Sequence, residues 1–202
     1  MKLSFSELIR HLSDQIRARY LNFKLPFLVG IDGPDCSGKT TIARALVTEL
    51  KQDLATALHH FDEYLSPKER RDYRGAFSVD AFCFDYFDTN ALILGVLAPA
   101  IAWKSAAILK PSVVIIEGLF LYRKSTVRFF DYRIRLEASD ILILKRASKR
   151  DVELLGDEKW VKTHYKTQCI PAQHRYQQQD SPETVADYLI CVAGDDEYDI
   201  SC

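Results

Sequence analysis

Hydrophobic positions near the start of the chain alternate between helical spacing and short unbroken runs. A capping box at Ser4 and Glu7 opens an amphipathic pattern that predicts a helix over residues 5–20. An unbroken apolar run over residues 27–32 predicts a buried parallel strand. An apolar stripe over residues 40–50 predicts the next helix. The chain thus begins with the helix, strand and helix order of an α/β protein.

The rest of the chain continues this alternation, with one long polar interruption. Further strands are expected over residues 55–59, 113–116, 132–136 and 186–192. Further helices are expected over residues 89–97, 141–151 and 159–168, and a long polar loop over residues 61–79. Strands that alternate with helices indicate βαβ units, so we expect an α/β fold with a mostly parallel sheet flanked by helices.

Length, charge and composition limit the classes of protein to which this chain could belong. The 202 residues suit a single domain, and the 27 basic and 28 acidic residues lack the basic surplus of a general nucleic-acid binder. The five cysteines form no CxxC pair, which indicates neither a disulfide framework nor a zinc site. The start of the chain lacks an apolar signal core, and no apolar run approaches the roughly 20 residues of a membrane helix. We expect a cytoplasmic protein without nucleic-acid or membrane partners, and leave a homo-oligomer open.

A phosphate-binding motif lies between the first predicted strand and the helix that follows it. Residues 33–40 read GPDCSGKT and match G-x-x-x-x-G-K-[ST], the P-loop pattern. Its glycines let backbone N–H groups turn toward phosphate oxygens, and the helix N-terminus adds positive potential. Its lysine reaches the β- and γ-phosphates, and its last hydroxyl binds Mg²⁺. The expected nucleotide-binding residues are Gly33, Asp35, Cys36, Ser37, Gly38, Lys39, Thr40 and Thr41.

Two carboxylates follow predicted strands. Glu117 ends the strand over residues 113–116, at the edge of an open α/β sheet where ligands bind, so it is a candidate Mg²⁺ ligand. Asp62 follows the strand over residues 55–59 and could accept the proton of an attacking hydroxyl. A solvated acid is the alternative for each position, and for Asp62 the spacing alone favours neither interpretation.

Two arginines and one cysteine add candidate chemistry. Arg146 and Arg150 fall where a helix ends in a charged stretch, and guanidinium groups there could stabilise a transferring phosphoryl group. From the residues alone, a solvated basic helix end explains them better. Cys36 lies in the P-loop near a helix N-terminus, which predicts a lowered thiol pKa and alkylation that ATP would block.

These pieces together resemble the uridine kinase-like branch of P-loop nucleoside and small-molecule kinases. The resemblance is carried by residues 33–40, 62–64 (DEY) and 113–121 (VVIIEGLFL), and by Arg146 with Arg150-Asp151. Weaker matches are Gly75, residues 85–88, Ala91-Leu92, Tyr165, Pro171, Gln173, Tyr176 and Ala186-Asp187. They run in consistent order from Phe27 to Val192. The P-loop is specific, whereas the other pieces carry weight mainly as a series.

The resemblance implies a fold and a set of roles. The fold would be a three-layer P-loop NTPase domain over residues 1–202, with an N-terminal helix within residues 1–22 and a small lid near residues 147–165. ATP with Mg²⁺ would donate the phosphoryl group to a small-molecule acceptor. The implied catalytic residues are Lys39, Asp62 as general base, and Arg146 and Arg150 closing over the triphosphate. The implied metal ligands are Thr40 and Glu117. The implied acceptor residues are Asp62, Tyr64, Arg74, Asp85 and Tyr86.

One departure from the family leaves the acceptor open. Uridine kinases carry a hairpin with Pro, Tyr and His before the Glu-Gly strand, whereas residues 98–111 here read APAIAWKSAAILKP. A nucleoside such as uridine or cytidine is the acceptor that the resemblance favours. Another small hydroxyl compound, pantothenate-like or sugar-phosphate-like, is the alternative.

Three other classes of P-loop protein compete with a kinase. A regulatory GTPase needs an N/TKxD motif, which the chain lacks, and its DxxG match at residues 72–75 follows no apolar strand. An ATPase that powers an assembly would need added modules. A module that only binds nucleotide would need neither Asp62 nor Glu117. Hydrolysis without an acceptor would indicate the ATPase, and binding without turnover the module.

Overall fold

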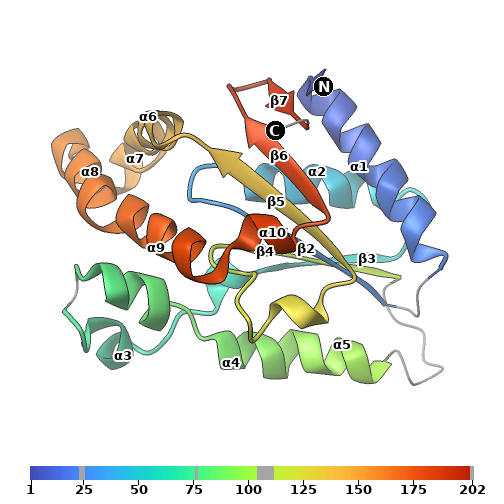
Figure 1. The fold of residues 1–202 in the computed structure, drawn as a ribbon, viewed down its shortest axis with the longest axis horizontal. Coiled ribbons are helices and arrows are strands. Elements are labelled where there is room, and N and C mark those ends of the chain that lie inside the picture. The colour runs from blue at the N-terminus through green and yellow to red at the C-terminus, as the bar shows by residue number, and fades with distance from the viewer. Residues whose placement is uncertain (23–25, 76, 104–111, 201–202) are drawn as a thin grey trace.

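The computed structural model describes residues 1–22, 26–75, 77–103 and 112–200, which form one sheet with helices on both faces (Figure 1). The sheet order is β1-β7-β6-β5-β2-β4-β3. The strands are β1 (Lys2–Leu3), β2 (Phe27–Asp32), β3 (Thr56–His60), β4 (Val113–Gly118), β5 (Tyr132–Ala138), β6 (Tyr188–Val192) and β7 (Tyr198–Asp199). The pairings from β6 through β3 are parallel, and β7 pairs antiparallel with β6 and β1. The expected α/β class with a mostly parallel sheet is therefore confirmed.

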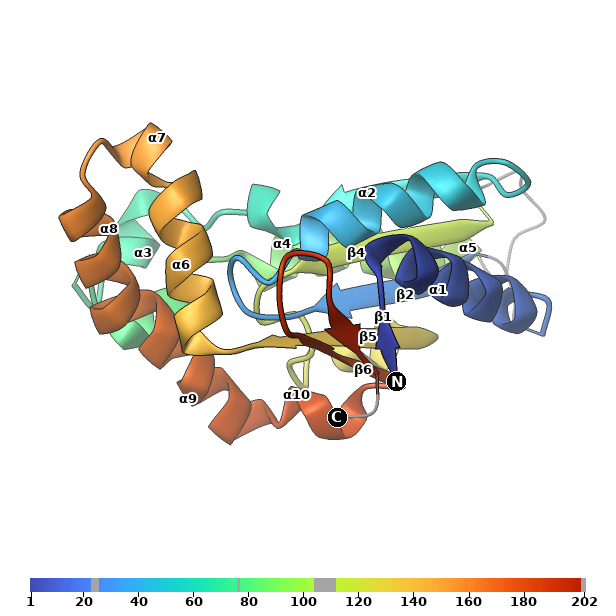
Figure 2. The same cartoon turned by 90° about the horizontal axis from the view of Figure 1, so that it is seen from above.

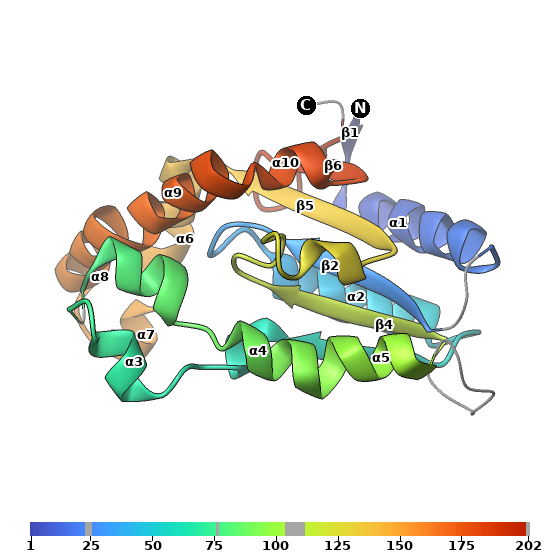
Figure 3. The same ribbon diagram turned by 60° about the horizontal axis from the view of Figure 1, so that its bottom comes forward.

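Two apolar layers join the helices to the sheet. On one face, α1 (Phe5–Tyr20) packs on α2 (Lys39–Leu50), and both cover the side chains of alternate sheet residues such as Val29 and Ile115 (Figure 2). On the other face lie a helix over Thr89–Trp103 and the later helices (Figure 3). The 89–103 helix consists of α4 (Thr89–Leu92), a π-helical segment, η3 (Ile93–Leu97), and α5 (Ala98–Trp103). Because successive side chains of a strand point to opposite faces of the sheet, each strand contributes side chains to both apolar layers.

The carboxyl-terminal half carries a long helical excursion beside the sheet. It runs through α6 (Asp140–Arg150), α7 (Val152–Leu155), α8 (Glu158–His164), η5 (Tyr165–Cys169) and α9 (Ile170–Asp180), and α10 (Pro182–Val185) leads into β6. The segment expected as a lid, residues 147–165, comprises the end of α6 and all of α7 and α8. In the described ranges, no helix combines the length and apolarity needed to traverse a bilayer.

Element boundaries differ from the sequence predictions at several places. The expected loop over residues 61–79 holds a 3₁₀ turn, η1 (Phe61–Glu63), and α3 (Lys68–Asp72), and it is followed by η2 (Ala81–Asp85). The helix expected over 159–168 continues to Asp180. It can pass Pro171 because the π-helical turn that precedes this proline places it at the start of α9, where a helix needs no backbone N–H donor. The strands β1 and β7 were not expected, since two-residue strands carry no periodic pattern.

Cysteine chemistry departs from expectation at one position. Cys36, Cys83 and Cys169 are free thiols. Cys191 is disulfide-bonded, a bond that the scattered cysteine spacing did not lead us to expect.

A buried ion pair lies directly beneath the loop that follows β2. Arg135 of β5 donates from Nη1 to Asp32 Oδ2 at 2.6 Å, and both side chains are buried. The same carboxylate accepts hydrogen bonds from the Leu121 N–H at 3.0 Å and from the Tyr176 hydroxyl at 3.0 Å. The cluster joins β2, β5, the loop after β4 and α9, so it fixes the segments that surround the P-loop.

Candidate active site

The P-loop motif connects β2 to α2, as the sequence predicted. Gly38 adopts a φ of 99° at the N-cap of α2, a left-handed conformation that favours glycine. Lys39 is buried, and its Nζ donates to the carbonyl of Pro34 at 2.8 Å. Within the described residues, the buried hydroxyl of Ser37 has no hydrogen-bond partner. A buried polar group without a partner costs free energy, so this hydroxyl is suited to bind a ligand such as a phosphate.

Glu117 lies at the carboxyl end of β4, beside the start of α2. Its Oε1 accepts a hydrogen bond from the Thr40 hydroxyl at 3.0 Å and lies 2.6 Å from His60 Nδ1. Its Oε2 is buried and has no partner among the residues that the structure describes. A carboxylate and a hydroxyl, with phosphates and water supplying the other oxygens, are the donors that Mg²⁺ prefers. The residues present therefore fit a magnesium site, and the Thr40–Glu117 pair that the sequence suggested is in contact.

Asp62 lies in η1, immediately after β3. Gly118 fixes this turn, because a Cβ there would lie 2.5 Å from the Cβ of Phe61. The Asp62 side chain lines the cleft that also contains the P-loop. Although Asp62 is exposed in the open cleft, the protein groups around its carboxylate desolvate it and raise its pKa, and the charges of Glu117 and Asp35 act in the same direction, against Lys39. A raised pKa in a cleft is typical of a group that accepts and releases protons.

A hydrogen-bonded cluster ties the P-loop to the helical excursion. The Tyr165 hydroxyl lies 2.7 Å from Asp35 Oδ2 and 2.8 Å from Asp151 Oδ2, and it accepts from Arg150 Nη2 at 3.0 Å. Burial raises the pKa of Tyr165, with Asp35 adding to the effect. Burial alone would raise the pKa of Asp35, but the charges of Arg150 and Lys39 outweigh it, so this pKa is lowered. The cluster therefore holds a carboxylate anion beside a neutral phenol.

The thiol of Cys36 differs from the sequence prediction. Burial and the negative charge of Asp35 raise its pKa to about 11, although Arg150 and Tyr165 act in the opposite direction. The prediction of a lowered pKa is therefore wrong. It considered the helix N-terminus alone, whereas the neighbouring carboxylate and the apolar surroundings dominate.

Arg146 lies in α6 and spans from the P-loop to the turn after β6. Its Nη1 donates to the carbonyls of Cys36 and Ser37 at 3.1 and 3.2 Å, and its Nη2 donates to the carbonyl of Gly194 at 2.7 Å. Its Nε lies 3.5 Å from Asp195 Oδ1. All three guanidinium nitrogens thus have protein partners.

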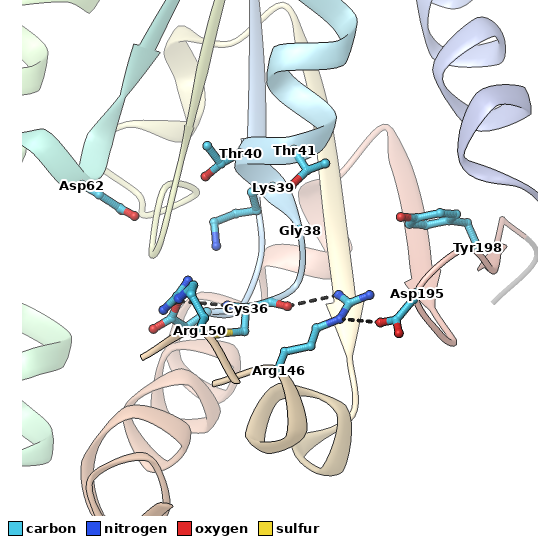
Figure 4. A pocket seen from close by; sticks show the side chains of 11 residues that line it. Cys36, Gly38, Lys39, Thr40, Thr41, Asp62, Arg146, Arg150, Asp195 and Tyr198 are labelled. Carbon is cyan, nitrogen blue, oxygen red and sulfur yellow. Dashed lines mark hydrogen bonds and ion pairs between the residues drawn. The ribbon is translucent and has the colours of Figure 1, made fainter. Parts of the chain in front are cut away.

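Most of the predicted catalytic and nucleotide-binding residues line one cavity of about 430 Å³ (Figure 4). Asp62 lies at one end of this cavity, the P-loop lies in the middle, and Asp195 and Tyr198 lie at the other end. The predicted residues that line it are Asp35, Cys36, Gly38, Lys39, Thr40, Thr41, Asp62, Arg146 and Arg150.

A second cavity of about 330 Å³ adjoins the Asp62 end. It shares Asp35, Asp62 and Arg150 with the first cavity, and its other walls are mostly aromatic and apolar. Those other residues are Leu65, Phe82, Tyr86, Phe87, Leu119, Asp151, His164, Tyr165 and Cys169. The bridge between Leu65 and Phe87 ties two of the wall segments together.

The structure brings together only part of the predicted acceptor set. Asp62 and Tyr86 line the second cavity. Arg74 Nε donates to Asp85 Oδ2 at 2.6 Å, and Tyr64 packs toward Gly95 of the 89–103 helix. Uridine kinases carry a hairpin where this chain has residues 98–111. Residues 98–103 of this segment are helical, and residues 104–111 lie outside the described residues.

Sequence reasoning missed several site residues. They are His60, which contacts Glu117, Tyr165, which bridges Asp35 and Asp151, and Asp195, which lies beside Arg146. All come from segments distant in sequence from the P-loop. Asp151 and Tyr165 appeared only as matches within the resemblance. No spacing rule would have identified their partners, because the contacts arise from the packing of α6 and η5 on the P-loop.

Comparisons with known proteins support the resemblance. No model of a known protein family matches the chain. The chain is 28% identical over 149 residues to a uridine kinase of Leuconostoc citreum, a match that covers 65% of this chain and 71% of that protein. It is 26% identical over 154 residues to a uridine kinase of Saccharomyces cerevisiae, which covers 65% of this chain and 30% of the yeast protein. The chain thus spans less than a third of that second relative.

Solved structures share the fold. A possible uridine kinase from Bacillus stearothermophilus superposes with a TM-score of 0.66 at 20% identity, covering 90% of this chain and 96% of that one. A D-glycerate 3-kinase from Cryptococcus neoformans gives a TM-score of 0.61 at 10% identity, covering 92% and 95%. The three-layer P-loop fold and the likeness to uridine kinase-like proteins are confirmed, and the curated relatives are kinases.

Proposed function

We propose that this protein is an ATP-dependent phosphotransferase that moves the γ-phosphate to a hydroxyl of a small molecule. The observation that carries the proposal is a single cavity in which the P-loop lysine, Lys39, and the carboxylate of Asp62 both line the walls. An ATP-binding module alone would need no carboxylate of raised pKa beside the phosphate site. Kinase relatives at modest identity support the same reaction class.

Each residue has a distinct part in the proposed mechanism. Lys39 and the P-loop N–H groups hold the β- and γ-phosphates, which requires Lys39 Nζ to leave the Pro34 carbonyl. Asp62 accepts the proton of the acceptor hydroxyl as that oxygen attacks in line. Arg150, about half exposed, can turn from Asp151 toward the transferring phosphoryl group. Thr40 and Glu117 would hold Mg²⁺, which neutralises developing charge on the phosphates.

The second cavity is the proposed acceptor site. It opens at Asp62, so a hydroxyl of a molecule bound there would reach the carboxylate. Its aromatic walls favour a planar or apolar ring over a small, strongly charged compound. A nucleoside such as uridine or cytidine is therefore the first candidate, in line with the names of the curated relatives. A pantothenate-like or sugar-phosphate-like alcohol is the alternative. A glycerate kinase shares the fold, so the fold alone does not determine which acceptor is bound.

The remaining expectations also stay proposals. The cytoplasmic location, the absence of nucleic-acid and membrane partners, the lid over residues 147–165 and the acceptor roles of Tyr64, Arg74 and Asp85 rest on the sequence. A homo-oligomer stays open.

An acceptor screen tests the proposal. ADP release from ATP and Mg²⁺ would be measured alone and with uridine, cytidine, other nucleosides, pantothenate, glycerate and sugar phosphates. We expect one acceptor class to raise ADP release well above the background rate. ADP release that is fast and equal with every acceptor would instead indicate an ATPase. Nucleotide binding without any release would indicate a binding module.

A further inference from the structure

His60 lies at the carboxyl end of β3, directly beside Glu117. β3 and β4 pair in parallel, with His60 in register with Glu117 at the edge of the sheet where β2 leads into the P-loop. The His60 side chain is 21% exposed, whereas that of Glu117 is 1% exposed. No motif in the sequence and no part of the resemblance gives His60 a role, although its ring contacts a proposed metal ligand.

The two carboxylate oxygens of Glu117 have different surroundings. Oε1 lies 2.6 Å from His60 Nδ1 and accepts a hydrogen bond from the Thr40 hydroxyl at 3.0 Å. An ionised carboxylate only accepts hydrogen bonds, so Nδ1 carries the proton of this contact. Oε2 is buried and has no hydrogen-bond partner among the described residues. One oxygen is thus held by protein donors, and the other is left for a ligand.

The Thr40 hydroxyl by itself would hold Glu117 only loosely. A hydroxyl has one proton and two lone pairs, so Thr40 can bind a cation through its oxygen while it donates to Oε1. The last torsion of a glutamate side chain is broad, and one hydrogen bond restrains it weakly. His60 supplies a second donor from β3, whereas Thr40 belongs to α2. Two donors from different elements together restrain the carboxylate.

We propose that His60 is the positioning residue of the magnesium site, an inference that rests on the proposed function. Its Nδ1–H holds Glu117 in the conformation that leaves Oε2 available to the cation. Mg²⁺ demands near-ideal octahedral geometry, whereas Ca²⁺ tolerates flexible arrangements of oxygen ligands. A restrained carboxylate therefore favours Mg²⁺ over Ca²⁺, and His60 contributes to this preference as well as to the affinity for the metal.

Equilibrium binding tests this role without any phosphoryl transfer. The affinity for AMP-PNP, a non-hydrolysable ATP analogue, would be measured by calorimetry in EDTA, in Mg²⁺ and in Ca²⁺, without acceptor. The Mg²⁺ ratio is the affinity in Mg²⁺ divided by the affinity in EDTA. We expect His60→Leu to lower this ratio about tenfold, the usual effect of removing a hydrogen-bond partner of a metal ligand. The affinity in EDTA should stay within about twofold, and the corresponding Ca²⁺ ratio should fall less.

Two polar variants locate the effect at Nδ1. Asn has the shape of Leu but carries amide N–H donors near the position of Nδ1, so His60→Asn should retain most of the wild-type Mg²⁺ ratio. His60→Gln carries its amide one carbon further along the side chain, so it should behave like His60→Leu.

The neighbouring histidine provides a matched control. Leu58 packs in the apolar layer of α1 and α2, and Ala57 packs in the opposite layer. Strand side chains alternate, so His60 shares the face of Leu58 and His59 shares the face of Ala57. His59→Leu should therefore keep the wild-type Mg²⁺ ratio.

The outcomes separate this inference from the proposed function. A wild-type Mg²⁺ ratio in His60→Leu would overturn the positioning role. Equal ratios in His60→Asn and His60→Gln would also overturn it, and this comparison does not depend on the folding of His60→Leu. An equal loss of affinity in EDTA and in Mg²⁺ would indicate a structural role instead. If Mg²⁺ had no effect on the wild-type protein, the metal site itself would be overturned. If the binding results were as expected but no acceptor received phosphate, only the proposed function would fail.

Discussion

The proposed phosphate half and the proposed acceptor half of the cleft are built in different ways. The phosphate half comes from one continuous stretch, residues 33–41, and its geometry follows from a glycine with positive φ and a helix N-terminus. The proposed acceptor half is assembled from η1, η2, the loop after β4, and η5, which are brought together by packing of η1 on β4, of η2 on α9 and of η5 on α6. Local chemistry thus determines the proposed phosphate site, whereas tertiary packing determines the shape of the proposed acceptor site.

The largest expected effect is in the phosphate half. Lys39→Ala removes the buried cation nearest the proposed γ-phosphate, so we expect turnover to fall about 10³-fold. Steady-state rates with a saturating acceptor would measure it. Lys51→Ala, at the exposed end of α2, is the control and should retain the wild-type rate. Retention of more than a tenth of the activity in Lys39→Ala would show that this half of the cleft is misassigned.

The second prediction concerns the packing that joins the two halves. Arg135→Met leaves Asp32 buried without its ion pair, so we expect the free energy of unfolding to fall by about 3 kcal/mol or more. Chemical denaturation followed by circular dichroism would measure it. Arg133→Met on the same strand breaks a partly exposed pair with Asp187 and should cost about 1 kcal/mol or less. Equal losses in the two variants would contradict the central role of the buried cluster.

The third prediction distinguishes the two halves by kinetics. Asp62→Asn keeps the shape of the side chain but cannot accept the proton, so we expect kcat to fall about 10²-fold. The dissociation constant for ATP should stay within about twofold, since Asp62 lies at the acceptor end of the cavity. Glu63→Gln, the neighbouring carboxylate, lines neither cavity and serves as the control. Parallel losses of kcat and ATP affinity would count against a general base.

The smallest effect is on the chemical reactivity of Cys36. With a pKa of about 11, its thiolate fraction rises about tenfold for each pH unit between pH 7 and pH 10. Alkylation by iodoacetamide should therefore be slow at pH 7 and accelerate across this range, which peptide mass spectrometry would follow. A rate that levels off between about pH 9 and pH 10 would indicate an ordinary thiol and would contradict the raised pKa.

The sequence predicted the central elements of the fold and the phosphate half of the site. Residues 27–32 and 113–116 are buried on both faces and therefore read as unbroken apolar runs, and the P-loop is a local motif. The contact between Thr40 and Glu117 followed from the rule that parallel strands end at one edge.

Other features could not be predicted, for physical reasons. The strands β1 and β7 are too short to carry a pattern, and the helices in the 61–85 segment are short and polar. The pKa of Cys36 depends on burial and on Asp35, which oppose the helix N-terminus. The partners of Tyr165 and Arg146 depend on how α6 and η5 dock, which no local spacing encodes.

The fate of the γ-phosphate of ATP distinguishes phosphoryl transfer to a small molecule from hydrolysis. γ-³²P-labelled ATP would be incubated with the protein, Mg²⁺ and the acceptor class that the screen identifies, and the products would be separated by chromatography. We predict that the label enters a phosphomonoester of the acceptor with wild-type protein, and that this transfer falls sharply in Asp62→Asn. Label that appears only as inorganic phosphate, at the same rate with and without acceptor, would contradict phosphoryl transfer to a small molecule.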